Sequence, residues 1–117
     1  MVATKELIDK NSDAVRGVLR ALYDGEKVVR NSPSDSYKAV SRVLGGTLKP
    51  DQVASASKNY YFRMNLDKSM LDLMVKEGMW ILGRGSIKAD MPTAGSIRPY
   101  IDTSFLQSID ASRVNLK

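Results

Sequence analysis

The side chains that carry most enzyme chemistry are absent from this sequence, which contains no cysteine and no histidine. Disulfides, cysteine nucleophiles, imidazole metal ligands and Ser-His-Asp catalysis are therefore excluded. Among the carboxylates, Asp67, Asp72 and Glu77 have only the spacing of residues on a helix surface. Acid–base catalysis by a carboxylate pair needs two acids that converge in a pocket. The sequence thus predicts a protein that is not an enzyme and has no catalytic residues, metal or cofactor.

Positive charge is the next candidate for function, because 18 Lys and Arg residues stand against 13 Asp and Glu residues, a net charge of +5. A basic helix face can neutralise nucleic-acid phosphates. In the first long helix, however, acidic residues fall at three- or four-residue spacing from the basic ones and favour ion pairs within the helix. We therefore expect a solvated face and no nucleic-acid partner. The residues concerned are Asp13, Arg16, Arg20, Asp24, Glu26, Lys27 and Arg30.

Two apolar clusters could bind a ligand or a partner. The run Tyr60-Tyr61-Phe62 is expected on a helix, where neighbouring side chains point about 100° apart and cannot form one stacking platform. We therefore expect two of these rings in the core and one in solvent. Trp80, Met70 and Met74, with Met64 and Met79, form a stripe that favours core packing. In a piece of a larger protein, part of that stripe would instead be exposed where a partner packs.

Helix signals recur along the chain. Asn11 is a predicted N-cap, and Ser32-Pro33 opens a helix that Gly45-Gly46 ends. Gly17 and Gly25 lie inside the first long helix and indicate close packing or a weak point. The GRGS run, residues 83–86, follows a helix, so it is a C-cap and not a phosphate loop. We predict one all-α domain over residues 1–117, a bundle of about four to five helices. Its expected elements are helices at 12–30, 33–45, 50–63 and 66–83, a loop at 84–101 and a short helix at 102–109, with a helical turn at 4–9.

Four collinear phrases suggest a family. The stretch VATKELIDKNSDAVRGVLRALYDGEKVVR, its continuation NSPSDSYKAVSRVLGGTLKPD, the segment WILGRGSIK and the phrase IDTSFL occur in that order. Together they resemble the C-terminal region of bacterial ABC-transporter substrate-binding proteins of the nitrate-, sulfonate/taurine- and thiamine-precursor-binding type. Ser12 departs from the pattern, since the family usually has proline there. The resemblance covers nearly the whole chain.

The resemblance implies a helical fragment of a two-lobe α/β periplasmic-binding-protein fold. The full-length protein would be a periplasmic or extracytoplasmic lipoprotein that captures a small-molecule solute and delivers it to an ABC permease. This chain shows no signal peptide and is expected to lack the N-terminal lobes that hold the ligand motifs. No ligand-binding residue can therefore be assigned, and the fragment alone is expected not to bind solute. We also expect self-association that buries the Met70, Met74 and Trp80 side.

An alternative explains the same composition without a larger protein. The chain would then be a stand-alone basic helical module that binds nucleic acid or protein. The two hypotheses differ in what surrounds the domain: the receptor hypothesis requires further residues upstream, beginning with a signal peptide. The module hypothesis requires a domain that is complete by itself.

Overall fold

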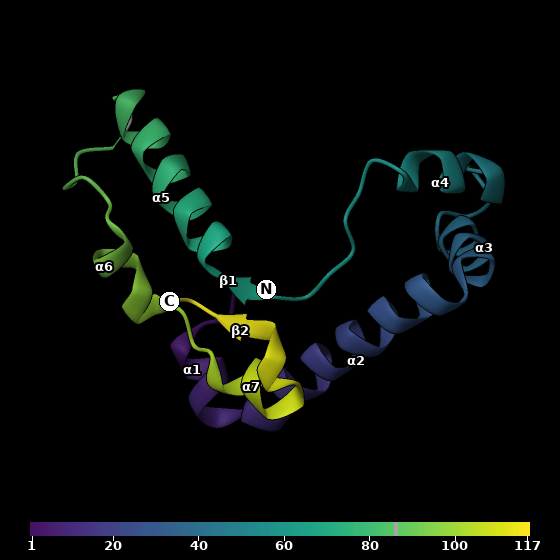
Figure 1. Ribbon diagram of the computed structural model, residues 1–117, viewed down its shortest axis with the longest axis horizontal. Helices are drawn as coiled ribbons and strands as arrows, with labels where there is room; N and C mark the ends of the chain where they lie inside the picture. Colours follow the sequence, from purple (N-terminus) through teal and green to yellow (C-terminus); the bar gives the residue numbers. More distant parts are fainter. Residues whose placement is uncertain (86) are drawn as a thin grey trace. The chain divides into compact units, whose positions relative to one another are not determined.

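The computed structural model describes residues 1–85 and 87–117, and the chain is mostly helical, as predicted (Figure 1). It divides into two compact units, an N-terminal unit of residues Met1–Met64 and a C-terminal unit of residues Asn65–Lys117, where the sequence suggested one domain. The N-terminal unit contains α1 (Lys5–Lys10), α2 (Ser12–Asn31), α3 (Pro33–Val43) and α4 (Pro50–Ser57). The C-terminal unit contains β1 (Leu66–Asp67), α5 (Lys68–Gly83), α6 (Ala94–Ile97), η1 (Arg98–Tyr100), α7 (Ser104–Ile109), η2 (Ala111–Arg113) and β2 (Val114–Asn115).

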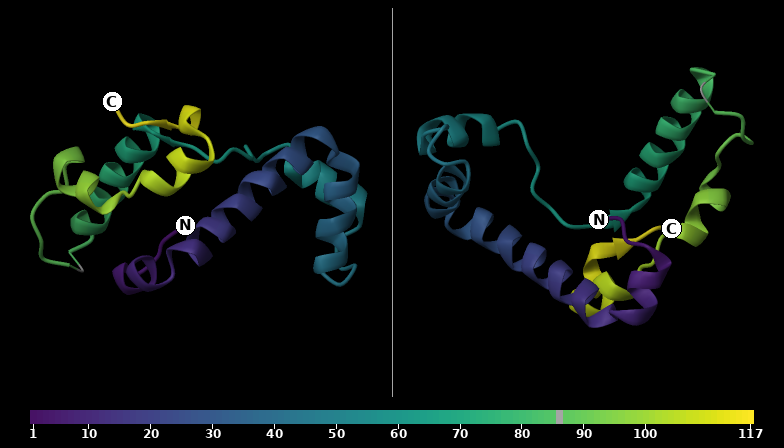
Figure 2. Two further views of the ribbon diagram at one scale, coloured as in Figure 1. Left: turned by 90° about the horizontal axis from the view of Figure 1, so that it is seen from below. Right: turned by 180° about the vertical axis from the view of Figure 1, so that it is seen from behind.

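The N-terminal unit is a chain of helices in which each packs against the next, and α3 and α4 lie side by side (Figure 2). The predicted helix starts are correct, but neither Asn11 nor Ser32 caps its helix with its side chain. Gly45 and Gly46 end the α3 region at φ values of 63° and 75°. Glycine adopts this left-handed conformation without the steric cost of a Cβ, so the predicted stop is confirmed.

The third predicted helix, at 50–63, is wrong in its second half, because α4 already ends at Ser57. A turn follows, in which the backbone N–H groups of Asn59 and Tyr60 donate to the carbonyls of Ala56 and Ser57. The backbone then runs without helix from residue 60 to residue 65. This short non-helical stretch carries all three residues of the aromatic run, which changes how those rings are presented.

In the C-terminal unit the strands form a parallel pair, with Leu66 opposite Val114 and Asp67 opposite Asn115. The long helix α5 follows β1 directly and packs against α6. The predicted loop at 84–101 is wrong from residue 94 onward, where α6 and η1 form. Thr93 caps α6: its hydroxyl accepts from the backbone N–H of Ser96 at 3.1 Å. Gly85 ends the α5 region at φ 72°. Ser86, the last residue of the predicted C-cap, lies outside the described residues.

Little of the chain is buried. In the described residues the buried apolar side chains are Val15, Val53, Leu71, Phe105 and Leu106, and no large side chain is less than 2% exposed. The chain exposes 8803 Å² of surface, whereas one compact protein of 12.9 kDa should expose about 6,300 Å² and two separate compact units of half that mass about 7,600 Å². The helices therefore leave apolar surface in water that a complete core would cover.

Alanine substitution at two glycines within helices is expected to change stability in opposite directions. A Cβ added at Gly25, inside α2, would meet no atom within 4 Å, and the same holds for Gly17, so the predicted close packing at these positions is wrong. We expect Gly25→Ala to stabilise α2 by up to about 1 kcal/mol, because alanine loses less backbone entropy in a helix. A Cβ at Gly78 would lie 2.8 Å from Cγ of Pro92. Since the proline ring cannot turn aside, Gly78→Ala should destabilise α5 by about 1 kcal/mol or more.

Urea unfolding followed by circular dichroism measures both glycine variants. A change in the free energy of unfolding with the same sign in Gly25→Ala and Gly78→Ala would contradict the packing of α5 against Pro92.

Candidate interaction surfaces

The long helix α5 is apolar on two sides. Its more buried side, which we call the inner face, carries Leu71, Val75, Gly78 and Leu82, of which Leu71 is only 4% exposed. A second set of apolar residues lies on the opposite side at the helical spacing i, i+1, i+7 and i+8. We call this set the outer face of α5; it comprises Leu73, Met74, Trp80 and Ile81, with Glu77 among them, and all five are exposed.

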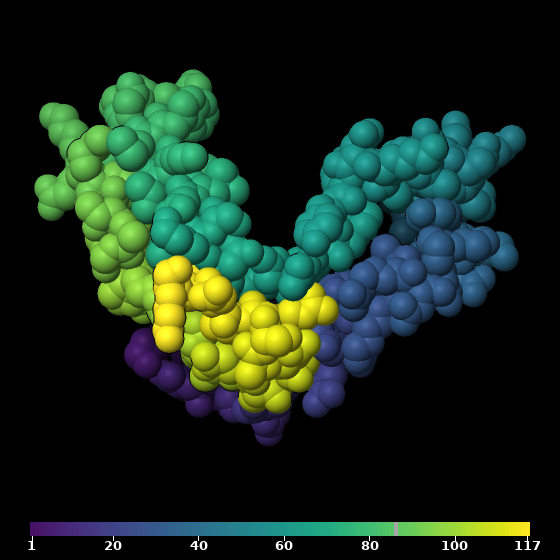
Figure 3. Space-filling view, in the orientation of Figure 1, coloured from purple at the N-terminus to yellow at the C-terminus, as the bar shows by residue number. Residues whose placement is uncertain are grey.

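The outer face corrects the predicted packing of the methionine and tryptophan stripe. Trp80 is 63% exposed and Met74 is 38% exposed, so the core-packing interpretation fails for both. Met70 is half-buried. The Arg84 guanidinium lies 5.0 Å from the centre of the Trp80 ring, a distance at which cation and ring attract each other. Side chains of α5, in green, form part of the molecular surface in the space-filling view (Figure 3).

A helix with one apolar face is stable on the surface of a domain, whereas a helix with two apolar faces is normally covered on both sides. The outer face of α5 is exposed in this structure, and Glu77 is the single charged residue of this face. Because contiguous exposed apolar patches usually mark contact sites, the outer face is the first candidate interaction surface.

Asp67 fixes the start of α5 and connects it to the strand pair. Its carboxylate accepts from the Ser69 hydroxyl at 2.6 Å, from the Met70 backbone N–H at 3.1 Å and from the Asn65 side-chain amide. These hydrogen bonds, that of Ser69 foremost, hold the pKa of Asp67 below its ordinary value of 3.8. A carboxylate at a helix N-terminus is also stabilised by the helix dipole.

The depressed pKa of Asp67 predicts a pH dependence for the C-terminal unit. Because the folded pKa is lower than the unfolded one, the ionised Asp67 stabilises the fold above pH of about 4, and this contribution is lost as the pH falls through the folded pKa. Asparagine can still cap the helix but carries no charge. The wild-type chain should therefore be more stable than Asp67→Asn at pH 7, and the difference should shrink towards pH 3. Urea unfolding at both pH values measures it; a constant difference would contradict the assigned role.

The second candidate surface lies in the N-terminal unit, between α3, α4 and the segment after α4. A groove of about 300 Å³ opens there and is almost entirely apolar. We call it the α3–α4 groove; it is lined by Val40, Leu48, Val53, Ala56, Ser57, Tyr60 and Phe62. Val53 is buried at its base, and Ser41 of α3 donates its hydroxyl to the carbonyl of Leu48 at 2.6 Å, which holds the α3–α4 connection in place.

The aromatic run presents its rings in a way that the helix prediction missed. In an extended backbone, side chains two residues apart point to the same side. Tyr60 and Phe62 accordingly both line the groove, with ring centres 6.2 Å apart, while Tyr61 does not line it and is 83% exposed. The prediction that two of these rings are in the core is wrong, because Tyr60 is 69% and Phe62 is 46% exposed.

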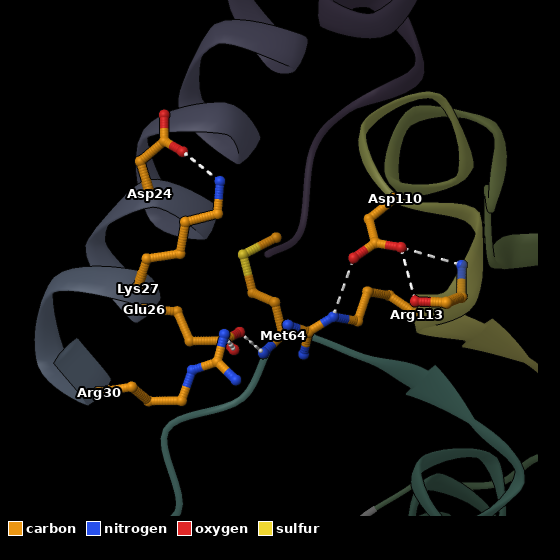
Figure 4. A network of polar contacts seen from close by, with 8 residues as sticks. Asp24, Glu26, Lys27, Arg30, Met64, Asp110 and Arg113 are labelled. Carbon is orange, nitrogen blue, oxygen red and sulfur yellow. Dashed lines mark hydrogen bonds and ion pairs between the residues drawn. The ribbon is translucent and has the colours of Figure 1, made fainter.

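A buried carboxylate anchors the end of this aromatic segment. Glu26 of α2 is only 6% exposed. Its Oε2 accepts from the backbone N–H of Met64 at 2.7 Å, and its Oε1 lies 3.2 Å from the Arg30 guanidinium (Figure 4). Glu26 therefore ties residue 64 to α2 and limits the positions that Tyr60 and Phe62 can take beside the groove.

The basic face of α2 forms ion pairs, as expected. Arg30 pairs with Glu26, and Lys27 lies 3.2 Å from Asp24 and over the Tyr23 ring at 4.4 Å. These interactions reduce the positive field of the helix.

The described residues contain no cluster of three or more acidic side chains that could hold a metal ion. No helix in the same ranges is both long and apolar enough to cross a membrane.

Comparison of the chain with protein families, with curated proteins and with solved structures finds no match. The two surfaces are therefore interpreted from their chemistry. The outer face of α5 was partly visible in the sequence as the methionine and tryptophan stripe. The groove was not predicted, because the sequence placed Tyr60, Tyr61 and Phe62 on a helix.

Proposed function

We propose that this chain is the C-terminal portion of an extracytoplasmic solute-binding receptor of an ABC importer. In that receptor another part of the same protein covers the outer face of α5. The observation that carries the proposal is the second apolar side of α5, which exposes Leu73, Trp80 and Ile81. Such a face costs free energy in water at roughly 25 cal/mol per Å² of apolar surface, so a covering surface is strongly favoured.

The strand pair supports the same proposal. Parallel strands occur almost only in α/β proteins, in sheets covered on both faces by helices. Here β1 and β2 are joined by a connection that contains α5, and each strand pairs only with the other in the described ranges. A larger parallel sheet that extends this pair would fit the two-lobe α/β fold that the sequence resemblance implies.

In this proposal the chain contributes packing surface, and the solute cleft lies elsewhere in the receptor. The full receptor would capture a small solute and pass it to a membrane permease through closure of its lobes. The stand-alone module is the alternative, and the α3–α4 groove favours its protein-binding form, because an almost wholly apolar lining suits a side chain better than a phosphate backbone.

Cysteine labelling tests the proposal, because the chain has no cysteine of its own. Leu73→Cys places a thiol on the outer face, and Lys76→Cys places one on the exposed charged side of the same helix. Each variant is expressed alone and together with the polypeptide encoded upstream in the same reading frame. We expect a maleimide to label both variants alone, and co-expression to protect Leu73→Cys only. Absence of an upstream polypeptide, or equal labelling of the two variants in its presence, would overturn the proposal.

A further inference from the structure

The segment between α4 and β1 exposes both its side chains and its backbone. Residues 60–65 form neither helix nor strand and run as a drawn-out trace between the two elements (Figure 1). Tyr60 is 69% exposed and Tyr61 is 83% exposed. Within the described part of the chain, residues 61–63 form no hydrogen bond through their backbone. Exposed, irregular segments of this kind are the preferred sites at which proteases cut folded proteins.

The same segment joins the two units and interrupts no regular element. The helix α4 ends at Ser57, the strand β1 begins at Leu66, and the boundary between the compact units follows Met64. A break after residue 61 therefore leaves every described helix and strand within one polypeptide. A break inside a helix, by contrast, first requires that helix to unfold locally, which costs free energy and slows cleavage.

Aromatic residues distinguish this segment from the rest of the chain, which has five tyrosines, two phenylalanines and one tryptophan. Three of these rings stand at 60–62, and the others lie in α-helices or in the 3-10 helix η1: Tyr23, Tyr37, Trp80, Tyr100 and Phe105. The non-helical stretch at 87–93 is mostly exposed but contains no aromatic residue. An endoprotease whose specificity pocket accepts an aromatic ring therefore finds non-helical targets at 60–62.

We propose that the peptide bond between Tyr61 and Phe62 is a site of limited proteolysis, cut by an endoprotease that recognises an aromatic side chain. Tyr60 and Phe62 line the α3–α4 groove, whereas Tyr61 does not and is the most exposed of the three. Its ring is therefore available to a specificity pocket.

Hydrolysis adds one water molecule across this bond. The C–N bond breaks, the carbonyl carbon of Tyr61 becomes a carboxylate, and the nitrogen of Phe62 becomes a new amino terminus. The products are residues 1–61 and 62–117, which carry the helices of the N-terminal unit and the whole C-terminal unit. The inference rests on this segment and holds whether or not the receptor proposal is correct.

Limited digestion of the full chain with chymotrypsin, followed over time by mass spectrometry, tests the inference. We expect 1–61 and 62–117 to be the first products. They should form at least about tenfold faster than products cut after Trp80 or Tyr100, because those bonds lie in helices that must open first. Trp80 and Tyr100 are 63% and 88% exposed, so they separate the effect of backbone conformation from that of side-chain exposure.

Two matched variants locate the cut. Tyr61→Ser removes the recognised ring and should lower the rate at which 1–61 forms by at least about tenfold. Tyr100→Ser removes a ring of similar exposure from η1 and should leave that rate unchanged. Both side chains are exposed, and circular dichroism checks that both variants keep their helices. A first cut at any other bond, persistence of the intact chain, or an unchanged rate in Tyr61→Ser would overturn the inference.

Discussion

Replacing Leu71 with alanine is expected to lower the free energy of unfolding of the C-terminal unit by about 3 kcal/mol. Leu71 is 4% exposed and is the only buried residue of α5. Its truncation removes apolar contacts and leaves a cavity that the surrounding residues fill only in part. The loss is a large share of the stability of a small unit with so few buried side chains.

Trp80 makes this measurement selective, because it is the single tryptophan and lies in the C-terminal unit. Urea unfolding followed by its fluorescence in dilute protein therefore reports on this unit alone. Leu73→Ala is the matched control, with the same chemical change on the same helix at a side chain that is 54% exposed. It should cost less than about 0.5 kcal/mol. Equal losses for the two variants would contradict the assignment of inner and outer faces.

Replacing Glu26 with alanine should release the aromatic segment from α2. The variant leaves the Met64 N–H without this acceptor and removes the ion pair with Arg30. A hydrogen bond to a charged group is worth about 1.5–3 kcal/mol. Glu26→Gln is the matched control, since its amide oxygen can still accept from Met64 and only the charge is lost.

Amide hydrogen exchange at Met64 measures the effect of the Glu26 substitutions. We expect exchange to rise by about tenfold or more in Glu26→Ala and much less in Glu26→Gln, in line with the cost of the lost hydrogen bond. If the Met64 amide exchanged equally fast in both variants and the wild-type chain, Glu26 would not anchor this segment.

The sequence predicted local features that depend on a few neighbouring residues. The starts of α2 and α3 and the glycine stops at Gly45 and Gly85 follow from cap and turn chemistry. The end of α4 was missed because Tyr60, Tyr61 and Phe62 continue an apolar pattern without a glycine or proline to interrupt it. In a short apolar run, periodicity alone cannot distinguish a helix from an extended segment.

Contacts between distant segments of the chain could not be predicted from the sequence. The pairing of Leu66 with Val114 uses strands of two residues, which are too short to show alternation. The stripe on α5 was identified, but the sequence favoured core packing for both Met74 and Trp80. The structure exposes both, because the side of α5 that is buried depends on where distant segments such as Pro92 pack against it.

The outer face of α5 is tested most directly by the oligomeric mass of the purified chain, with acrylamide quenching of Trp80 on the same sample. If this face is an interaction surface, the chain alone should associate as concentration rises, and Trp80 should become shielded. Leu73→Glu should restore an unshielded monomer, whereas the control Lys76→Glu should not. A stable helical monomer at all concentrations, with Trp80 always open to quencher, would show that the outer face needs no cover and would contradict this interpretation.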